Sequence, residues 1–422
     1  MILSTILTGV LLATASPPPP AGDLLAIRVG RAETVSHGAI EHAVILVEKG
    51  KIVAVGEDLP VQRGIPTLDR PDWVVLPGLV NCYSRVGMDS QAGRDFEPEI
   101  HASAELYPRQ DIYREVLEAG VTTLGLYPPG TGVPGQAVAI RPRGDTSEAM
   151  ILADPVYLKI YLESNATSTK TLRDAFAKVD EYDEKVKKEK EKWEKEQEKK
   201  KKPKKEDEGK EKEQEQGQTA EKKDKAPSVF TPPEPDPKVL PFLQLRQKKL
   251  RALMRIQKAA DYDHLLDVIE KEDIDWMVRC PLRDDIDFFH VEDKIGERKL
   301  IAVLDPEITL QPSTRRERNI PAEFARAGAR LVLVPRRDDA RGHELWLKHV
   351  GELIAAGLAR DVALSAVTLE AANVLGLGER LGSIDPGKDA NLVFWNGDPF
   401  EAGTEVQAVM LEGEFVHGEV GQ

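Results

Sequence analysis

The sequence predicts an α/β protein with a central run of repeated βα units and a small β-domain built from both ends of the chain. Both ends contain short apolar strands separated by turn residues, which is typical of antiparallel sheets. The centre alternates apolar strands with amphipathic helices, the pattern that parallel sheets require. A third segment, from about 172 to 237, is dominated by charged residues and fits neither pattern.

The two strand-rich ends are expected to fold together. Residues 43–47 and 51–55 are apolar and flank Glu48, Lys49 and Gly50, a composition that predicts a tight hairpin. Residues 390–395 and 406–416 repeat this strand pattern near the other end. We therefore expect residues 16–76 and 385–422 to form the two parts of one β-sandwich around an α/β region at 77–384.

The α/β region shows its units most clearly at two places. Residues 119–126 and 326–335 each combine the end of a helix, a glycine and an apolar strand. Residues 343–359 and 363–375 have the apolar spacing of helices and are expected to complete this region.

The charged segment is expected to lie outside the core. Residues 184–205 alternate Lys and Glu, and the resulting i,i+4 pairs predict a solvated helix in which Trp193 is an isolated apolar side chain. Residues 217–237 are rich in Gln, Pro and Lys, which indicates disorder. Two interpretations stay open, a solvated spacer and a docking arm for a partner.

The net charge of the chain limits its binding partners, and its first 15 residues indicate where the protein is located. The chain carries a net charge of −14, and this acidic surface argues against binding of nucleic acid or anionic lipid. Residues 1–15 are apolar and end in Ala13-Thr14-Ala15, which predicts a cleaved signal peptide and a periplasmic or secreted protein. This stretch is short for a stable membrane span. A retained anchor or a misassigned start is the alternative.

Four stretches resemble a known family: residues 74–85 (VVLPGLVNCYSR), 129–137 (PGTGVPGQA), 363–377 (ALSAVTLEAANVLGL) and 381–393 (LGSIDPGKDANLV). They are similar to motifs of the amidohydrolase superfamily, in particular its imidazolonepropionase-like members. The resemblance implies a (β/α)8 TIM-like barrel at 77–384 with its site at the C-terminal ends of the strands. It also implies hydrolysis of carbon–nitrogen bonds with zinc or another divalent metal.

The positions at which the family places its metal ligands hold other residue types in this chain. Arg is always protonated and offers no lone pair, and Tyr is a weak ligand, so we expect neither catalytic residues nor a bound metal here. One family lysine that sometimes becomes a carboxylated bridging ligand has a counterpart. The resulting candidates for ligand binding are Tyr83, Arg85, Lys159, Arg255, Gln257, Cys280 and Arg336.

The three guanidinium groups of Arg85, Arg255 and Arg336 are expected near the barrel mouth, where they would repel a divalent cation. They would either pair with acids such as Asp89, Glu105 or Asp338 or bind an anionic small molecule, because the guanidinium fork matches a carboxylate. Strand alternation also predicts that Cys82 points away from the lumen.

The leading interpretation is a non-catalytic binding or assembly subunit, a homo-oligomer or a partner of an active relative. One alternative is an active metal-dependent amidohydrolase with a rearranged site, for which His101, His290 and Cys280 are the available ligands. The other is a structural scaffold that docks through its charged arm.

Overall fold

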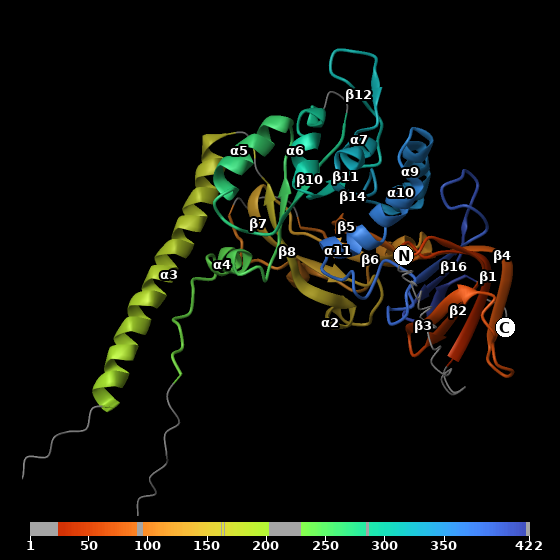
Figure 1. Ribbon diagram of the computed structural model, residues 1–422, viewed down its shortest axis with the longest axis horizontal. Coiled ribbons are helices and arrows are strands. Elements are labelled where there is room, and N and C mark those ends of the chain that lie inside the picture. The colour runs from red at the N-terminus through yellow and green to blue at the C-terminus, as the bar shows by residue number, and fades with distance from the viewer. Residues whose placement is uncertain are drawn as a thin grey trace, which may run out of the picture.

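The computed structural model describes residues 24–90, 96–161, 163, 165–201, 229–283 and 287–418. Two large sheets organise the chain, one of seven strands and one of eight (Figure 1). The expected signal peptide at 1–15 lies outside the described residues. Among the helices within them, none is both long enough and apolar enough to cross a membrane.

The seven-stranded sheet contains strands from both ends of the described chain, in the order β17-β16-β15-β4-β1-β2-β3. Strand β4 pairs in parallel with β1 and antiparallel with β15, so it joins the two sets. The strands are β1 (Leu24–Glu33), β2 (Ala39–Glu48), β3 (Lys51–Glu57), β4 (Thr67–Pro77), β15 (Leu392–Trp395), β16 (Val406–Leu411) and β17 (Glu414–His417).

The hairpin between β2 and β3 forms where the sequence predicts it. Lys49 and Gly50 both adopt positive φ angles, 48° and 77°, which suit a two-residue hairpin turn. A Cβ atom on Gly50 would lie 2.7 Å from the carbonyl oxygen of Glu412, so this position accepts only glycine.

The eight-stranded sheet has the order β14-β11-β10-β9-β8-β7-β6-β5. Its neighbours are parallel except for β7, which is antiparallel to both β6 and β8. The strands are β5 (Leu79–Ser84), β6 (Val121–Leu126), β7 (Gly132–Ile140), β8 (Ile151–Tyr161), β9 (Ala252–Arg255), β10 (Trp276–Cys280), β11 (Ile301–Leu304) and β14 (Arg330–Leu333).

This sheet curls so that its two faces carry different cores. Val80, Leu253, Met277, Val303 and Val332 share the inner cluster. The alternating residues of the same strands pack in the outer cluster, against the helices. The helices are α1 (Asp111–Glu118), α2 (Ser147–Met150), α4 (Leu240–Arg246), α5 (Ala259–Ile269), α6 (Glu292–Glu297), α7 (Ile320–Ala327), α8 (Ala340–Glu344), α9 (Trp346–Ala355), α10 (Arg360–Ala366) and α11 (Leu369–Val374).

The expectation of eight parallel βα units needs two corrections. Strand β7 reverses direction within the sheet, and among the described residues no ladder joins the edge strands β14 and β5. The segment around α11 lies at this opening instead. Ala371 and Leu375 share the inner cluster with Val80 and Val332, and the N–H of Val80 donates to the carbonyl of Val367 at 3.0 Å. The result is a curled, barrel-like sheet with a helical closure.

The charged segment begins as part of the core. Helix α3 (Ala166–Lys201) has 36 residues, and Leu172, Phe176 and Val179 in its first half are buried. Phe176 packs edge-on against Phe242 of α4, with ring centroids 5.3 Å apart. The boundary at about 172 was therefore too early, because an apolar stripe continues into the helix before the Lys-Glu repeats take over.

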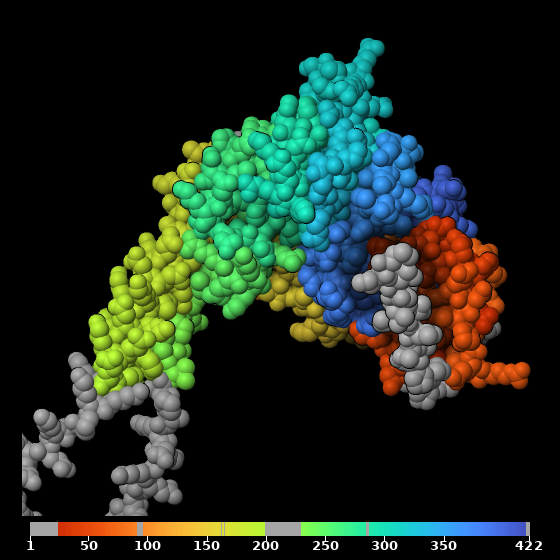
Figure 2. Space-filling model, in the orientation of Figure 1, coloured from red at the N-terminus to blue at the C-terminus, as the bar shows by residue number. Residues whose placement is uncertain are grey.

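The outer half of α3 is not an isolated helix. The hydroxyl of Tyr182 donates to the carbonyl of Pro233 at 2.8 Å, and the rings of Trp193 and Phe230 lie 5.9 Å apart. The chain before α4 thus returns along one face of α3, and the pair projects from the body as an arm (Figure 2). Residues 202–228, which include much of the segment predicted to be disordered, lie outside the described residues.

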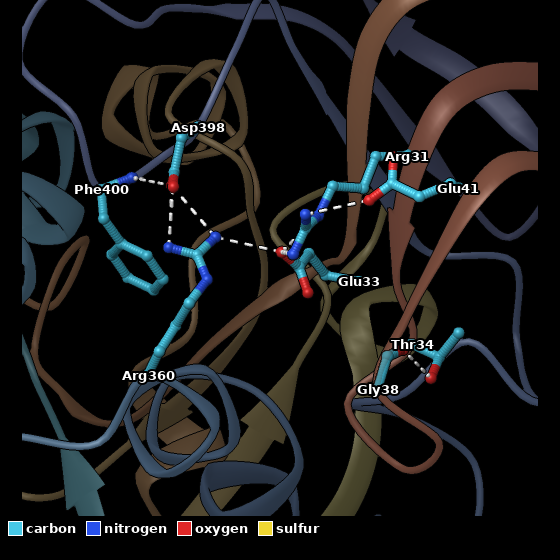
Figure 3. A network of polar contacts seen from close by, with 8 residues as sticks. All are labelled: Arg31, Glu33, Thr34, Gly38, Glu41, Arg360, Asp398 and Phe400. Atoms are coloured by element: carbon cyan, nitrogen blue, oxygen red, sulfur yellow. Dashed lines mark hydrogen bonds and ion pairs between the residues drawn. The ribbon is translucent and has the colours of Figure 1, made fainter.

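A polar network centred on Arg360 joins helix α10 to the seven-stranded sheet (Figure 3). Its guanidinium binds Asp398, which follows β15, at 2.8 Å and Glu33, at the end of β1, at 3.0 Å. Arg31 contacts the same Glu33 carboxylate at 3.0 Å. Phe400 packs its ring 4.9 Å from the Arg360 guanidinium carbon. These contacts fix the α/β region against the seven-stranded sheet.

Candidate anion-binding site

Cationic and aromatic side chains gather at the C-terminal ends of β5, β6, β8, β9 and β10. Parallel strands end at one edge of a sheet, so residues far apart in the sequence meet there. We call this group the mouth cluster, and its members are Tyr83, Arg85, Tyr127, Lys159, Arg255 and Arg279.

Two stacked rings form the middle of the mouth cluster. Tyr83 and Tyr127 have centroids 3.9 Å apart and an interplanar angle of 23°. The Lys159 amine lies 4.3 Å from the Tyr127 centroid, and the Arg279 guanidinium lies 5.4 Å from that of Tyr83. Cations are attracted to aromatic faces at these distances. Burial raises the pKa of both phenols, so they keep their protons.

Lys159 is almost completely buried, with 3% of its surface exposed. Its Nζ donates to the carbonyl oxygens of Pro128 and Gly130, each at 3.2 Å. Burial, with added repulsion from Arg255 and Arg85, lowers its pKa from 10.5 to about 7. The amine therefore carries only part of a positive charge at neutral pH.

Arg255 and Arg85 each contain a buried N–H group that lacks a hydrogen-bond partner. In Arg255 this group is Nε, and the guanidinium lies 4.9 Å from the ring centroid of Tyr161. In Arg85 it is Nη1, whereas Nη2 donates to the carbonyl of Ser90 at 2.5 Å. Within the described part of the chain, neither guanidinium forms an ion pair with a carboxylate. Buried donors of this kind ordinarily have an acceptor.

Arg279, by contrast, is compensated. Its Nη2 lies 2.5 Å from a carboxylate oxygen of Asp305, at the end of the neighbouring strand β11. The second oxygen of Asp305 accepts the N–H of Leu282 at 2.7 Å. This pair removes Arg279 from the set of charges that need a counter-ion.

A second acid, Asp338, lies beside the end of β5. It accepts the hydroxyl of Ser84 at 2.7 Å and the backbone N–H of Arg85 at 2.5 Å. Surrounding protein atoms desolvate the carboxylate and raise its pKa, although the side chain remains exposed to solvent. The neighbouring His343 is buried, which lowers its pKa, and it bonds to Asn81 and to the carbonyl of Asp339.

Four of the seven residues predicted for the site lie together in the mouth cluster: Tyr83, Arg85, Lys159 and Arg255. Gln257 lies at its edge, where its amide donates to the hydroxyl of Tyr161 at 2.5 Å.

The structure places the other two elsewhere. Cys280 belongs to the outer cluster, because alternation along β10 turns Arg279 inward instead. Arg336 pairs with Glu352 of α9 at 2.8 Å and donates to the carbonyl of Pro306. The acid brought next to β5 by this segment is Asp338.

Sequence reasoning missed Tyr127, Arg279 and Asp305, and it placed Cys82 on the wrong face. Alternation along β10 could have identified Arg279. Met277 faces the inner cluster, so Arg279, two residues later, faces the same side. Cys82 lies in the inner cluster beside Tyr83, because the register of β5 shifts between Asn81 and Ser84.

The donor set does not fit the divalent metal that the resemblance implies. Lys, Arg and Tyr side chains dominate the mouth cluster, and these are poor ligands for zinc. Among the described residues, no group of three or more His, Cys, Asp or Glu side chains could hold a metal ion. His101 instead pairs with Asp154, at 2.8 Å, and the alternative set of His101, His290 and Cys280 forms no such group.

Comparison with known proteins links this fold to a family. The Amidohydrolase family model matches residues 352–416. An amidohydrolase, tasK of Hapsidospora irregularis, is 42% identical over 57 residues, which is 14% of this chain and 6% of that protein. The chain therefore spans a small fraction of this relative's length. Both matches are short: the family model covers residues 352–416, and the relative aligns over 57 residues.

Solved structures extend the likeness to most of the chain. An amidohydrolase from Thermotoga maritima MSB8 has a TM-score of 0.73 and 22% identity, covering 94% of this chain and 100% of that one. Molinate hydrolase has a TM-score of 0.54 and 16% identity, covering 94% and 95%. Identities of this size establish a shared fold. Together the comparisons confirm the resemblance to the amidohydrolase superfamily.

Proposed function

We propose that this chain is a non-catalytic, amidohydrolase-like protein that binds an anionic small molecule at the mouth cluster. The observation that carries the proposal is uncompensated positive charge. Arg85 and Arg255 each have a buried N–H without an acceptor. Lys159, which carries part of a positive charge at neutral pH, adds a third basic group with no ion pair among the described residues.

Electrostatics favour an anion over a metal at this place. Two unit charges 4 Å apart interact by about 4 kcal/mol at an effective dielectric constant near 20. Like charges in the cluster therefore destabilise one another and would oppose a divalent cation, whereas an anion would relieve the repulsion. Burial is the main cause of the lowered pKa of Lys159, and repulsion from Arg255 and Arg85 lowers it further.

The groups present suggest the chemistry of the ligand. A guanidinium fork matches the two oxygens of a carboxylate or phosphate. A cavity of about 370 Å³ lies beside Tyr161, the ring over which Arg255 lies. Its lining contains no residue of the mouth cluster and includes Thr131, Gly132, Leu172 and one acid, Glu163. A ligand bound by the guanidinium groups would therefore direct a short apolar part, not its acidic group, toward this space.

Cellular role and assembly follow from the sequence as proposals. A periplasmic or secreted location fits the apolar residues 1–15, and the protein would act as a homo-oligomer or beside an active relative. The competing proposal is a metal-dependent amidohydrolase with a rearranged site, and metal content distinguishes the two.

The direct test is calorimetric titration of the full chain with malonate and, separately, inorganic phosphate at low ionic strength. We expect saturable binding of at least one, weakened about tenfold or more by Arg255→Met, because a charge-assisted hydrogen bond contributes about 1.5–3 kcal/mol. Arg336→Met is the matched control, because Arg336 is paired with Glu352 away from the cluster. Absence of binding, or equal loss in both variants, would contradict the proposal.

A further inference from the structure

We propose that the amine of Lys159 is a nucleophile that forms a reversible imine with a small oxo acid, such as pyruvate, held at the mouth cluster. This inference rests on the proposed anion site and names the class of its ligand. It concerns a covalent step that simple anion binding does not require.

The hydrogen bonds of Lys159 suit a neutral amine. A neutral amine has two N–H groups and one lone pair, and Nζ has two carbonyl acceptors, on Pro128 and Gly130, each at 3.2 Å. Both N–H groups are thereby satisfied, and the lone pair remains free. An ammonium would have a third N–H beyond these two, and the group beside it is the Tyr127 ring, whose centroid lies 4.3 Å from Nζ.

The surroundings favour this form of the amine. Among the described residues, no carboxylate forms an ion pair with Lys159, while the charges of Arg255 and Arg85 act on it. Lysine amines become nucleophilic when they are desolvated or placed beside other cations. The same two guanidinium groups would hold the carboxylate of an oxo acid and bring its carbonyl carbon toward the amine.

The reaction balances with the groups named. The nitrogen lone pair attacks the carbonyl carbon and gives a carbinolamine. One amine proton moves to the carbonyl oxygen, which becomes the hydroxyl of the carbinolamine. This hydroxyl takes the second amine proton and leaves as water, so that a C=N bond remains. No oxidant or second substrate is required. The near-complete burial of Lys159 restricts the ligand to compact oxo acids.

Lys388 provides an internal comparison. Its Nζ also donates to two backbone carbonyls, of Gly378 at 2.7 Å and Leu381 at 3.2 Å. It differs in having a carboxylate, Asp385, at 4.0 Å, and it lies outside the mouth cluster. Two carbonyl acceptors are therefore common to both lysines, and only Lys159 has arginines to hold an oxo acid.

The experiment is incubation of the full chain with pyruvate and sodium cyanoborohydride, followed by peptide mass mapping of the trapped secondary amine. We expect one reduced adduct on Lys159 and none on Lys388. Labelling should fall about tenfold in Arg255→Met, which loses a carboxylate-binding group. Because mapping is carried out on the unmodified chain, the result does not depend on folding of a Lys159 variant.

The outcomes separate this inference from the anion site. Malonate has no ketone or aldehyde group, so malonate binding without pyruvate labelling would leave the anion site standing and overturn the imine. Labelling spread evenly over surface lysines would also overturn it. Failure of both malonate binding and labelling would remove the two proposals together.

Discussion

Arg279 and Asp305 form a 2.5 Å ion pair between the ends of neighbouring strands β10 and β11. Their side chains are only 8% and 11% exposed. The Arg279 guanidinium lies 5.4 Å from the Tyr83 ring centroid, and Asp305 supplies its counter-ion. Arg85, Lys159 and Arg255 are left as the charges available to a ligand.

Removal of one partner of this pair should destabilise the fold. Arg279→Met leaves the Asp305 carboxylate buried without its counter-ion, and we expect the free energy of unfolding to fall by about 3–5 kcal/mol. Urea denaturation followed by circular dichroism measures the change. The double variant Arg279→Met/Asp305→Leu should lose less, since no buried charge is then left unpaired, although the N–H of Leu282 loses its acceptor and the carbonyl of Val303 loses the Arg279 donor. A single variant as stable as the parent would refute the structural role of the pair.

Lys159 predicts a particular dependence of stability on pH. Its pKa is about 7 in the fold and 10.5 without the surroundings, so the unfolded chain binds more protons between these values. Stability should therefore rise with pH across this window, by at most about 1.4 kcal/mol per pH unit. Lys159→Met should lack this rise. Parallel stability curves for the two proteins, measured by denaturation from neutral to alkaline pH, would argue against the shift.

Anion affinity should change with pH in the opposite direction. The positive charge of Lys159 is present below its pKa of about 7 and disappears above it. Malonate affinity is thus expected to fall as the pH is raised through neutrality, and the fall should be absent in Lys159→Met. Titration calorimetry in buffers of matched ionic strength provides the measurement. A pH-independent affinity in the parent would exclude Lys159 from the site.

The arm should be dispensable for the fold and for the anion site. Replacement of residues 186–230 by a short Gly-Ser linker keeps the buried Phe176 and Val179 and the contact of Tyr182 with Pro233. We expect unchanged stability and malonate affinity. Light scattering then tests the scaffold interpretation, since loss of an assembled state only in the deletion would identify the arm as an association element. Trp193→Ala, which removes the contact with Phe230, is the milder companion variant.

Much of the secondary structure could be predicted because it depends on local pattern. The β2–β3 hairpin follows from apolar runs around Lys49 and Gly50, and β15 and β16 follow from similar runs. The C-terminal motif identified the superfamily because its letters are specific. The direction and pairing of the strands were harder to predict from the sequence. The reversal of β7 and the opening between β14 and β5 depend on contacts between distant segments.

The site was predicted only where the strand register was right. An error of one position in β10 exchanges Arg279 for Cys280, and these side chains face opposite sides of the sheet. The prediction of Arg336 requires the strand to continue to that residue, whereas β14 ends at Leu333 and the chain beyond it brings Asp338 to β5. Tyr127 does not correspond to a metal-ligand position of the family, and its role depends on stacking with Tyr83, which the sequence alone does not show.

The central claim is that the mouth of this fold accommodates an anion in place of a divalent metal. Elemental analysis of the full chain, purified after expression with added zinc and manganese, tests it most directly. The account predicts a folded protein with far less than one metal ion per chain. A stoichiometric metal that is lost on Asp338→Asn would contradict it and would place a metal-dependent hydrolase site at this edge of the sheet.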